Sequence, residues 1–190
     1  MKKFISALLA LTAVLLAVFS FASCKSEKVN IKNKEELIQY LKDHPNSKIA
    51  VPNDLTNEAR ALLLLEANGI IRLKEGAGIA ATKADIAENP YKIEIVELEA
   101  AQLPLKLKDV AFAVINSNYA IPAGLNPVSD AVVVEGSYSA YGNILAVKED
   151  NKSTDKTKAL VAALNSRAVA DFIAGEYQGA VISVVENPGD

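Results

Sequence analysis

Short apolar runs alternate with amphipathic helical segments from about residue 34 onwards, and this alternation restricts the possible folds more than any other feature. Apolar residues recur at helical spacing within 34–42, and 56–68 carries a run of leucines that suits a buried helix face. Runs rich in β-branched residues predict strands at 48–51, 91–97, 110–115, 131–134 and 143–147. Strands that alternate with helices predict an α/β fold around a largely parallel sheet.

Less regular segments complete the predicted elements. A helical turn is predicted at 84–88, and a helix at 99–107 is interrupted by Pro104. Gly69 closes the helix at 56–68, because a residue without Cβ takes the left-handed conformation easily. The C-terminal part is predicted to form two helices followed by an apolar run, at 154–165, 167–177 and 180–185.

The N-terminus has the features of a secretory signal. Lys2 and Lys3 precede an almost wholly apolar stretch from Phe4 to Phe21, and small residues then lead to Cys24. A positive start, an apolar core and a small-residue cleavage region are typical of an export signal. A permanent membrane span is the alternative, because the stretch approaches the ~18 apolar residues that a span needs.

Cys24 is the one cysteine of the chain and the predicted lipidation site. It follows Phe21-Ala22-Ser23, which resembles a relaxed form of the lipobox, the cleavage and acylation site of bacterial lipoproteins, although a lipobox usually has leucine where Phe21 stands. We therefore expect 1–23 to be a signal peptide, 24–33 a tether, and the protein to be lipid-anchored at the periplasmic or extracellular face of a cell membrane. The alternative is a signal peptide that ends near an unmodified cysteine.

Composition and motif content exclude several function classes. The net charge is −3 with both signs mixed along the chain, so no basic block indicates a nucleic-acid partner. His44 is the one histidine and precedes Pro45 in a polar loop, so a metal cluster would lack ligands. No glycine-rich phosphate loop follows a predicted strand. The sequence thus predicts a protein that is not an enzyme, with no cofactor and no metal.

Arg60 is the first candidate binding residue. The segment VPNDLTNEAR, from Val51 to Arg60, places a strand end, a polar turn and a helix start in succession. Ligands of open α/β sheets bind outside the carboxyl ends of strands, beside helix N-termini. Asp54 or Thr56 would cap the helix, and Arg60 would hold a carboxylate with two parallel N–H bonds. The alternative role of Arg60 is a surface ion pair with Glu58 or Asp54.

Two asparagines are further candidates. Asn116 ends the apolar run at Ile115, and its amide offers both a donor and an acceptor, which suits a zwitterion. The alternative role for Asn116 is a helix N-cap. Asn143 opens a predicted strand after Tyr141-Gly142 and would do the same work as Asn116.

Together these segments resemble the NlpA/MetQ family of methionine-binding lipoproteins, the substrate-binding partners of an ABC importer. The resemblance covers about Ile31 to Val185, through the stretches IAVPNDLTNEARALLLLEANGIIRLKEG, IVELEAAQLP, DVAFAVINSNYAIPAGLNP, YGNILAVK and FIAGEYQGAVISV. It implies an α/β fold of the type II periplasmic-binding-protein kind and a free small amino acid, L-methionine, as ligand. It also implies that Arg60 holds the ligand carboxylate, and that Asn116 and Asn143 match the family's binding asparagines, with Asn118 a weaker match. The implied protein partner is the importer's permease.

The chain departs from the family in its N-terminal part. In the family a long segment precedes the region that matches Lys34, and it supplies the opening of the first lobe with the aromatic residues that enclose the ligand. We therefore expect 34–140 to be a second lobe and 141–190 a segment that returns to an incomplete first lobe. Weakened ligand binding is then expected, with exposed apolar residues on the C-terminal helices: Leu160, Val161, Leu164, Val169 and Phe172. The alternatives are a non-transport surface lipoprotein or interaction module derived from the family, or an inactive truncated product.

Overall fold

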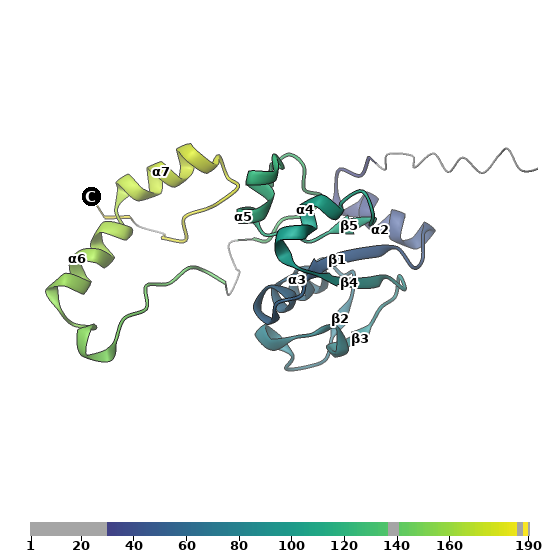
Figure 1. The fold of residues 1–190 in the computed structure, drawn as a ribbon, viewed down its shortest axis with the longest axis horizontal. Coiled ribbons are helices and arrows are strands. Elements are labelled where there is room, and N and C mark those ends of the chain that lie inside the picture. The colour runs from purple at the N-terminus through teal and green to yellow at the C-terminus, as the bar shows by residue number, and fades with distance from the viewer. Residues whose placement is uncertain (1–29, 137–140, 186–187, 190) are drawn as a thin grey trace, which may run out of the picture. The chain divides into compact units, whose positions relative to one another are not determined.

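A parallel three-stranded sheet in the order β4-β1-β5 forms the centre of the fold (Figure 1). The strands are β1, Lys48–Pro52, β4, Glu94–Leu98, and β5, Phe112–Ala113. β1 pairs with β4 over its full length, whereas β5 joins β1 only opposite Ile49 and Ala50. Every residue of β1 after Lys48 is buried, as expected for a central parallel strand covered on both faces. The predicted parallel α/β arrangement is confirmed.

The structure, a computed structural model, describes residues 30–136, 141–185 and 188–189. The helices and strands described here belong to one compact unit, which begins at Ile31. The predicted signal peptide and lipidation site, 1–23 and Cys24, lie outside the described residues. Within the described ranges, no helix combines the length and the apolar character needed to cross a membrane.

Two capped helices pack against the sheet. In α2, Lys34–Asp43, the cap residue Asn33 accepts a hydrogen bond from the Glu36 backbone N–H at 2.9 Å. In α3, Leu55–Ala67, the cap residue is Asp54, whose side chain accepts from the Asn57 N–H at 3.1 Å. Of the two predicted caps, Asp54 is therefore confirmed. Gly69, with φ of 71°, follows α3 in the predicted left-handed conformation.

The hydrophobic core lies between these helices and the sheet. Leu41 of α2 and Leu62 of α3 are fully buried, as is Ile49 of β1 apart from 1% of its surface. The buried cluster is Leu37, Leu41, Ile49, Ala59, Leu62, Leu65, Ile70, Ile71, Leu73, Ala81 and Ile93. This cluster fixes the start of α3 beside the end of β1, which is where the candidate binding residues lie.

A small antiparallel sheet was missed by the sequence prediction. β2, Arg72–Leu73, pairs with β3, Ile86–Glu88. Two short 3-10 helices lie between them in the chain: η1, Gly78–Ala80, and η2, Lys83–Asp85. The predicted helical turn at 84–88 is thus wrong beyond Asp85. Because β3 is stabilised by pairing with a distant segment, local periodicity contains no signal for it.

The connections around the main sheet also differ in detail from the prediction. The helix predicted at 99–107 is divided into η3, Ala100–Gln102, and α4, Leu103–Lys106, with Pro104 in the first turn of α4, where a missing N–H is tolerated. The strand predicted at 110–115 is shortened to β5, and it leads into α5, Ser117–Ala120, and η4, Ile121–Ala123.

Two predicted strands are wrong and two predicted helices are confirmed in the C-terminal part. Residues 131–134 and 143–147 form no strand, because a strand needs a neighbour that pairs its backbone groups, and the described residues place none beside them. After η5, Glu149–Asn151, the helices α6, Asp155–Leu164, and α7, Arg167–Tyr177, form as predicted. Their caps are Thr154 and Ser166, each accepting from a backbone N–H three residues later.

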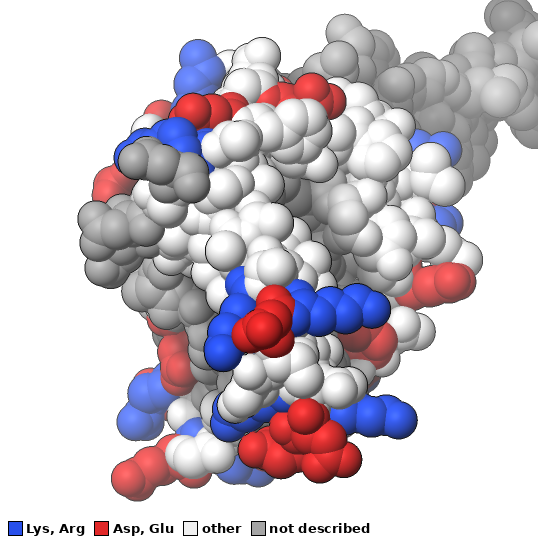
Figure 2. Space-filling model, turned by 90° about the vertical axis from the view of Figure 1, so that its left-hand side faces the viewer, with Lys and Arg blue, Asp and Glu red and all other residues white. Residues whose placement is uncertain are grey.

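Apolar side chains on α6 and α7 are exposed, as predicted. Leu160 is 46% exposed and Phe172 61%, and Val161 and Leu164 lie in the same range, whereas Val169 is half-buried. Figure 2 shows one face of the molecule, on which uncharged residues form a broad area bordered by charged side chains. The described helices α6 and α7 contain no fully buried residue, so they contribute little to the core.

Candidate functional site

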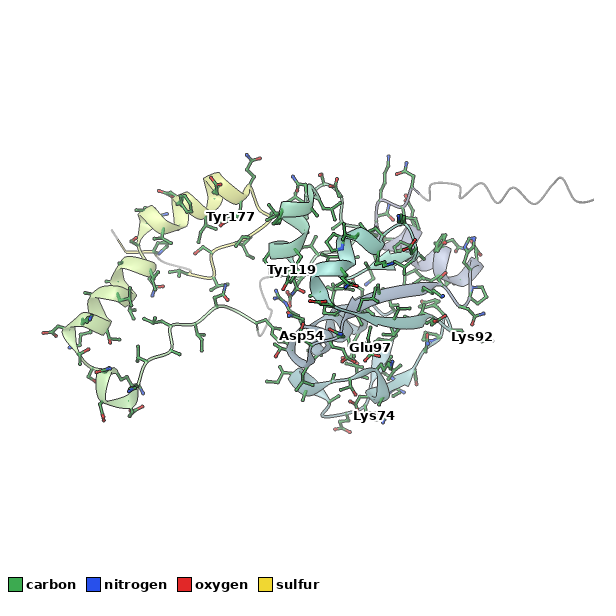
Figure 3. All side chains as sticks on the ribbon, viewed as in Figure 1. Asp54, Lys74, Lys92, Glu97, Tyr119 and Tyr177 are labelled. Atoms are coloured by element: carbon green, nitrogen blue, oxygen red, sulfur yellow. The ribbon has the colours of Figure 1, made fainter. Side chains whose placement is uncertain are left out.

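The candidate site lies at the edge of the sheet where parallel strands end. The turn to α3 follows β1, and Asn116 with α5 follows β5, so both loops lie at the same edge. Figure 3 shows Asp54 and Tyr119 at this edge, and Lys92, which precedes β4, at the opposite one. This edge is the usual ligand position in open α/β sheets.

A cavity of about 290 Å³ opens beside α3 and β5. Most of its wall is apolar and comes from α3, from β5 with its continuation to Ala120, and from 125–135. Its polar lining residues among the described ones are Asn57, Arg60, Asn116, Ser117, Asn126, Asp130 and Glu135. An apolar wall with a few convergent polar groups is typical of a small-ligand site.

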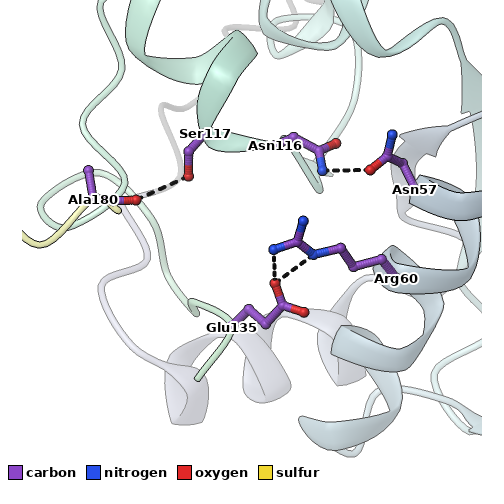
Figure 4. Close-up of polar contacts among 6 residues, drawn as sticks. All are labelled: Asn57, Arg60, Asn116, Ser117, Glu135 and Ala180. Carbon is purple, nitrogen blue, oxygen red and sulfur yellow. Dashed lines mark hydrogen bonds and ion pairs between the residues drawn. The ribbon is translucent and has the colours of Figure 1, made fainter. Parts of the chain in front are cut away.

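Arg60 forms an ion pair with Glu135 inside this cavity (Figure 4). Its Nε donates to Glu135 Oε2 at 2.6 Å, and its Nη2 donates to the same oxygen. The two side chains are 37% and 24% exposed, so the pair is partly screened by solvent. The alternative prediction, an ion pair of Arg60 with Glu58 or Asp54, is wrong. Glu58 is buried and accepts a hydrogen bond from the Lys83 N–H at 2.9 Å, and Asp54 caps α3.

Tyr141 is the aromatic neighbour of the ion pair. The Arg60 guanidinium carbon lies 5.4 Å from the centroid of the Tyr141 ring, within the range of a cation–π contact. Burial raises the pKa of the Tyr141 phenol above its ordinary value; the nearby Arg60 charge lowers it and that of Glu135 raises it. The phenol is therefore neutral at physiological pH.

A chain of side-chain hydrogen bonds fixes the orientation of Asn116. Asn57 Nδ2 donates to both carboxylate oxygens of Asp54 at 3.0 Å, which places the Asn57 carbonyl on the other side. Asn116 Nδ2 donates to this Asn57 Oδ1 at 2.9 Å (Figure 4). Because the Asn57 nitrogen is the atom that donates to Asp54 and the Asn57 oxygen the atom that accepts, both amides have defined orientations, and the Asn116 nitrogen faces Asn57.

Asn116 occupies the N-cap position that the alternative prediction gave it, but it does not cap the helix with its side chain. Asn116 is the N-cap residue of α5, with φ of −68° and ψ of 141°, yet its side chain makes no capping hydrogen bond. The neighbouring Ser117 hydroxyl instead donates to the Ala180 carbonyl at 3.2 Å, which joins α5 to the C-terminal segment (Figure 4). The Asn116 amide is thus directed toward the cavity partner Asn57 rather than toward its own helix.

The structure brings together two of the three predicted ligand residues. Arg60 and Asn116 both line the cavity. Asn143 is exposed and is not among the described residues that line it. Cys24 lies outside the described residues.

Among the lining residues that sequence reasoning missed, Asn57 and Glu135 are the two that hydrogen-bond to the predicted residues Asn116 and Arg60. Asn57 lies three residues before Arg60, a spacing that places both side chains on one helix face, so helical periodicity contained a usable signal. Glu135 is 75 residues from Arg60 in the chain, and no local pattern indicates that contact.

Known proteins resemble this chain in sequence and in fold. The profile of the NlpA lipoprotein family matches residues 16–185. The D-methionine-binding lipoprotein MetQ of Yersinia pestis is 42% identical over 154 residues, which is 80% of this chain and 55% of that protein. A solved nutrient binding protein from Burkholderia cenocepacia bound to methionine is 50% identical, with a TM-score of 0.67 over 75% of this chain and 61% of that one.

A third relative is a periplasmic substrate-binding protein of an ABC transporter from Coxiella burnetii, 52% identical, with a TM-score of 0.65 over 72% of this chain and 57% of that one. The chain thus spans little more than half the length of the relatives it matches. The solved relatives have the periplasmic-binding-protein fold, and this chain matches part of it. By its profile match over most of its length, the chain belongs to the NlpA lipoprotein family.

Proposed function

We propose that this protein binds a free amino acid, with L-methionine as the ligand, as the substrate-binding lipoprotein of an ABC importer whose permease is its partner. The convergence of Arg60 and Asn116 on a mostly apolar cavity at the carboxyl edge of the sheet carries this proposal. The Arg60 guanidinium holds the ligand carboxylate, the Asn116 carbonyl accepts from the ammonium group, and the apolar wall takes the thioether side chain. A binding protein of this kind needs no catalytic group.

Asn143 is the third proposed ligand residue, supported by the resemblance of its segment to the family. Residues 34–140 are proposed as the second lobe and 141–190 as the segment that returns to the first, which agrees with the exposed apolar residues of α6 and α7. Binding by one lobe is expected to be weak, because pockets usually enclose roughly 70–90% of a ligand's surface. Any part of the methionine side chain that the apolar wall of this one lobe does not cover forfeits its share of the ~1.5–3 kcal/mol that full burial contributes.

The anchor is a separate part of the proposal. We propose that Cys24 carries the lipid that holds the protein at the periplasmic or extracellular face of a cell membrane, in agreement with the lipoprotein relatives. Mass spectrometry of the mature N-terminus is expected to find a diacylated Cys24 in the exported protein. An unmodified Cys24, or a retained segment 1–23, would contradict the proposed lipid anchor and would leave the proposed ligand binding unaffected.

Isothermal titration calorimetry on residues 25–190 tests the binding function. L-Methionine is expected to bind with an affinity in the micromolar range or weaker, whereas 3-methylthiopropylamine, which lacks the carboxylate, is expected to give no heat. Absence of methionine binding by a chain that is folded by circular dichroism would contradict the proposal. Equal binding of the amine would contradict the role given to Arg60.

The second candidate is an interaction module without transport function, favoured by the exposed apolar side chains of α6 and α7. Contiguous exposed apolar surface is typical of a contact site for another protein. A folded chain that is silent toward amino acids in the same titration favours this candidate.

A further inference from the structure

The C-terminal part of the chain carries a large share of the exposed apolar surface. More than half of the exposed large apolar side chains among the described residues belong to 141–185, although this is the shorter part of the chain. We propose that α6 and α7 form the interface of a homodimer, in which α6 of each copy packs against α7 of its partner. This surface lies outside the amino-acid site, so the inference goes beyond the proposed function.

The exposed apolar residues of α6 lie on one face of the helix. Leu160 and Leu164 are four residues apart, and Val161 lies three residues before Leu164, so the three side chains are neighbours on the helix surface. All three are exposed, and α6 contains no buried residue. An apolar helix face of this kind is stabilised when a second surface covers it.

Lysines border this face of α6 on both sides. Lys156 is four residues before Leu160 and Lys158 three residues before Val161, and both lysines are exposed. Lys158 also lies 3.5 Å from the carboxylate of Asp155 within the same helix. With two lysines and one aspartate, α6 has a net charge of +1.

The exposed part of α7 has the opposite charge. Phe172 is exposed, and its neighbours Asp171 and Glu176, one residue before it and four residues after it, are exposed carboxylates. Val169 and Ile173 are half-buried, which leaves Phe172 as the large apolar side chain of α7 that most needs a cover. With one arginine and two acids, α7 has a net charge of −1.

The two helices therefore complement each other in charge and in apolar character. The lysine-bordered face of α6 fits the acid-bordered Phe172 of α7, and opposite charges across an interface favour the correct pairing. Within one copy the helices do not cover each other, because Leu160 and Phe172 both remain exposed. Two copies related by a twofold axis form the same contact twice, α6 on α7 and α7 on α6.

The size of the helices also favours two contacts over one. α6 has 10 residues and α7 has 11, so each is ~15 Å long and ~10 Å wide. Stable interfaces bury roughly 800 Å² on each partner, more than one contact between such short helices supplies. The twofold repeat doubles the buried area. A lipid surface is less favoured as the cover, since helices that lie on membranes have a basic polar face and α7 is acidic.

Sedimentation equilibrium on the mature chain, 25–190, tests the inference. We expect a dimer with a dissociation constant in the micromolar range. Phe172→Ser is expected to weaken this dimer about tenfold or more, because the aromatic ring no longer contributes its burial. Ile79→Ser is the matched control. Ile79 is 67% exposed in η1, outside both helices, and its replacement should leave the dimer unchanged.

A charge exchange tests which helices meet. One variant combines Lys156→Glu with Lys158→Glu on α6, and the other combines Asp171→Lys with Glu176→Lys on α7. Each variant alone places like charges in both contacts, so its dimer is expected to weaken about tenfold or more. An equal mixture pairs reversed α6 with reversed α7 and unmodified α7 with unmodified α6. Native mass spectrometry of the mixture is therefore expected to find dimers with one chain of each variant.

Several outcomes would overturn the inference. A folded, unmodified chain that stays monomeric at all concentrations would do so, as would a dimer that Phe172→Ser leaves intact. A mixture of the two charge variants that forms no mixed dimer would exclude the contact between α6 and α7. None of the five substituted residues of α6 and α7 lines the cavity, so methionine binding should be the same in every variant and is judged separately.

Discussion

Replacing Arg60 by alanine is expected to weaken methionine binding by about thirtyfold or more, because truncating one member of a hydrogen-bonded charge pair costs ~2 kcal/mol or more. The loss has two sources in this site. The ligand carboxylate loses the guanidinium fork, and the nearby Glu135 carboxylate, which Arg60 neutralises in the free protein, now repels it. Calorimetric titration with L-methionine measures the effect.

Arg72→Ala is the matched control for this prediction. It removes a guanidinium from an exposed ion pair with Glu88 on the β2-β3 sheet, outside the cavity lining. Its methionine affinity should equal that of the unmodified chain. Arg60→Lys should fall between the two, since an ammonium group keeps the charge but not the planar fork. Retained affinity in Arg60→Ala would remove this residue from the binding site.

Replacing Leu62 by alanine is expected to lower the free energy of unfolding by ~2–5 kcal/mol, the cost of removing a fully buried leucine. Leu62 is 0% exposed and lies in the core cluster between α3 and the sheet. For a domain whose total stability is about 5–15 kcal/mol, this is a large share. Urea denaturation should show a lower midpoint with an unchanged slope.

Leu55→Ala provides the comparison within the same helix. Leu55 begins α3 and is 61% exposed, so its truncation should change the free energy of unfolding by no more than ~0.5 kcal/mol. Similar midpoints for the two variants would show that α3 does not pack on the sheet as described.

Part of the candidate site was predictable from local patterns. Arg60 and Asn116 follow strands, and polar residues after parallel strands gather at one edge of a sheet, so their convergence follows from the α/β pattern. Asn57 was also predictable, because its spacing of three residues from Arg60 places both side chains on one face of the helix. Glu135 was not, because its contact depends on how the segment after β5 folds back over α3.

The sequence by itself determined the elements that satisfy their own backbone groups and the parallel sheet they surround. Helices α2, α3, α6 and α7 were predicted within one residue of their observed bounds, since caps and helical periodicity are local. Only the tertiary structure decided which apolar runs became strands. The segments 131–134 and 143–147 have the composition of strands but remain irregular, while Arg72–Leu73 pairs with Ile86–Glu88. A strand is completed by hydrogen bonds to a neighbour that is often far away in the chain, so its existence depends on the assembled fold and not on its own residues.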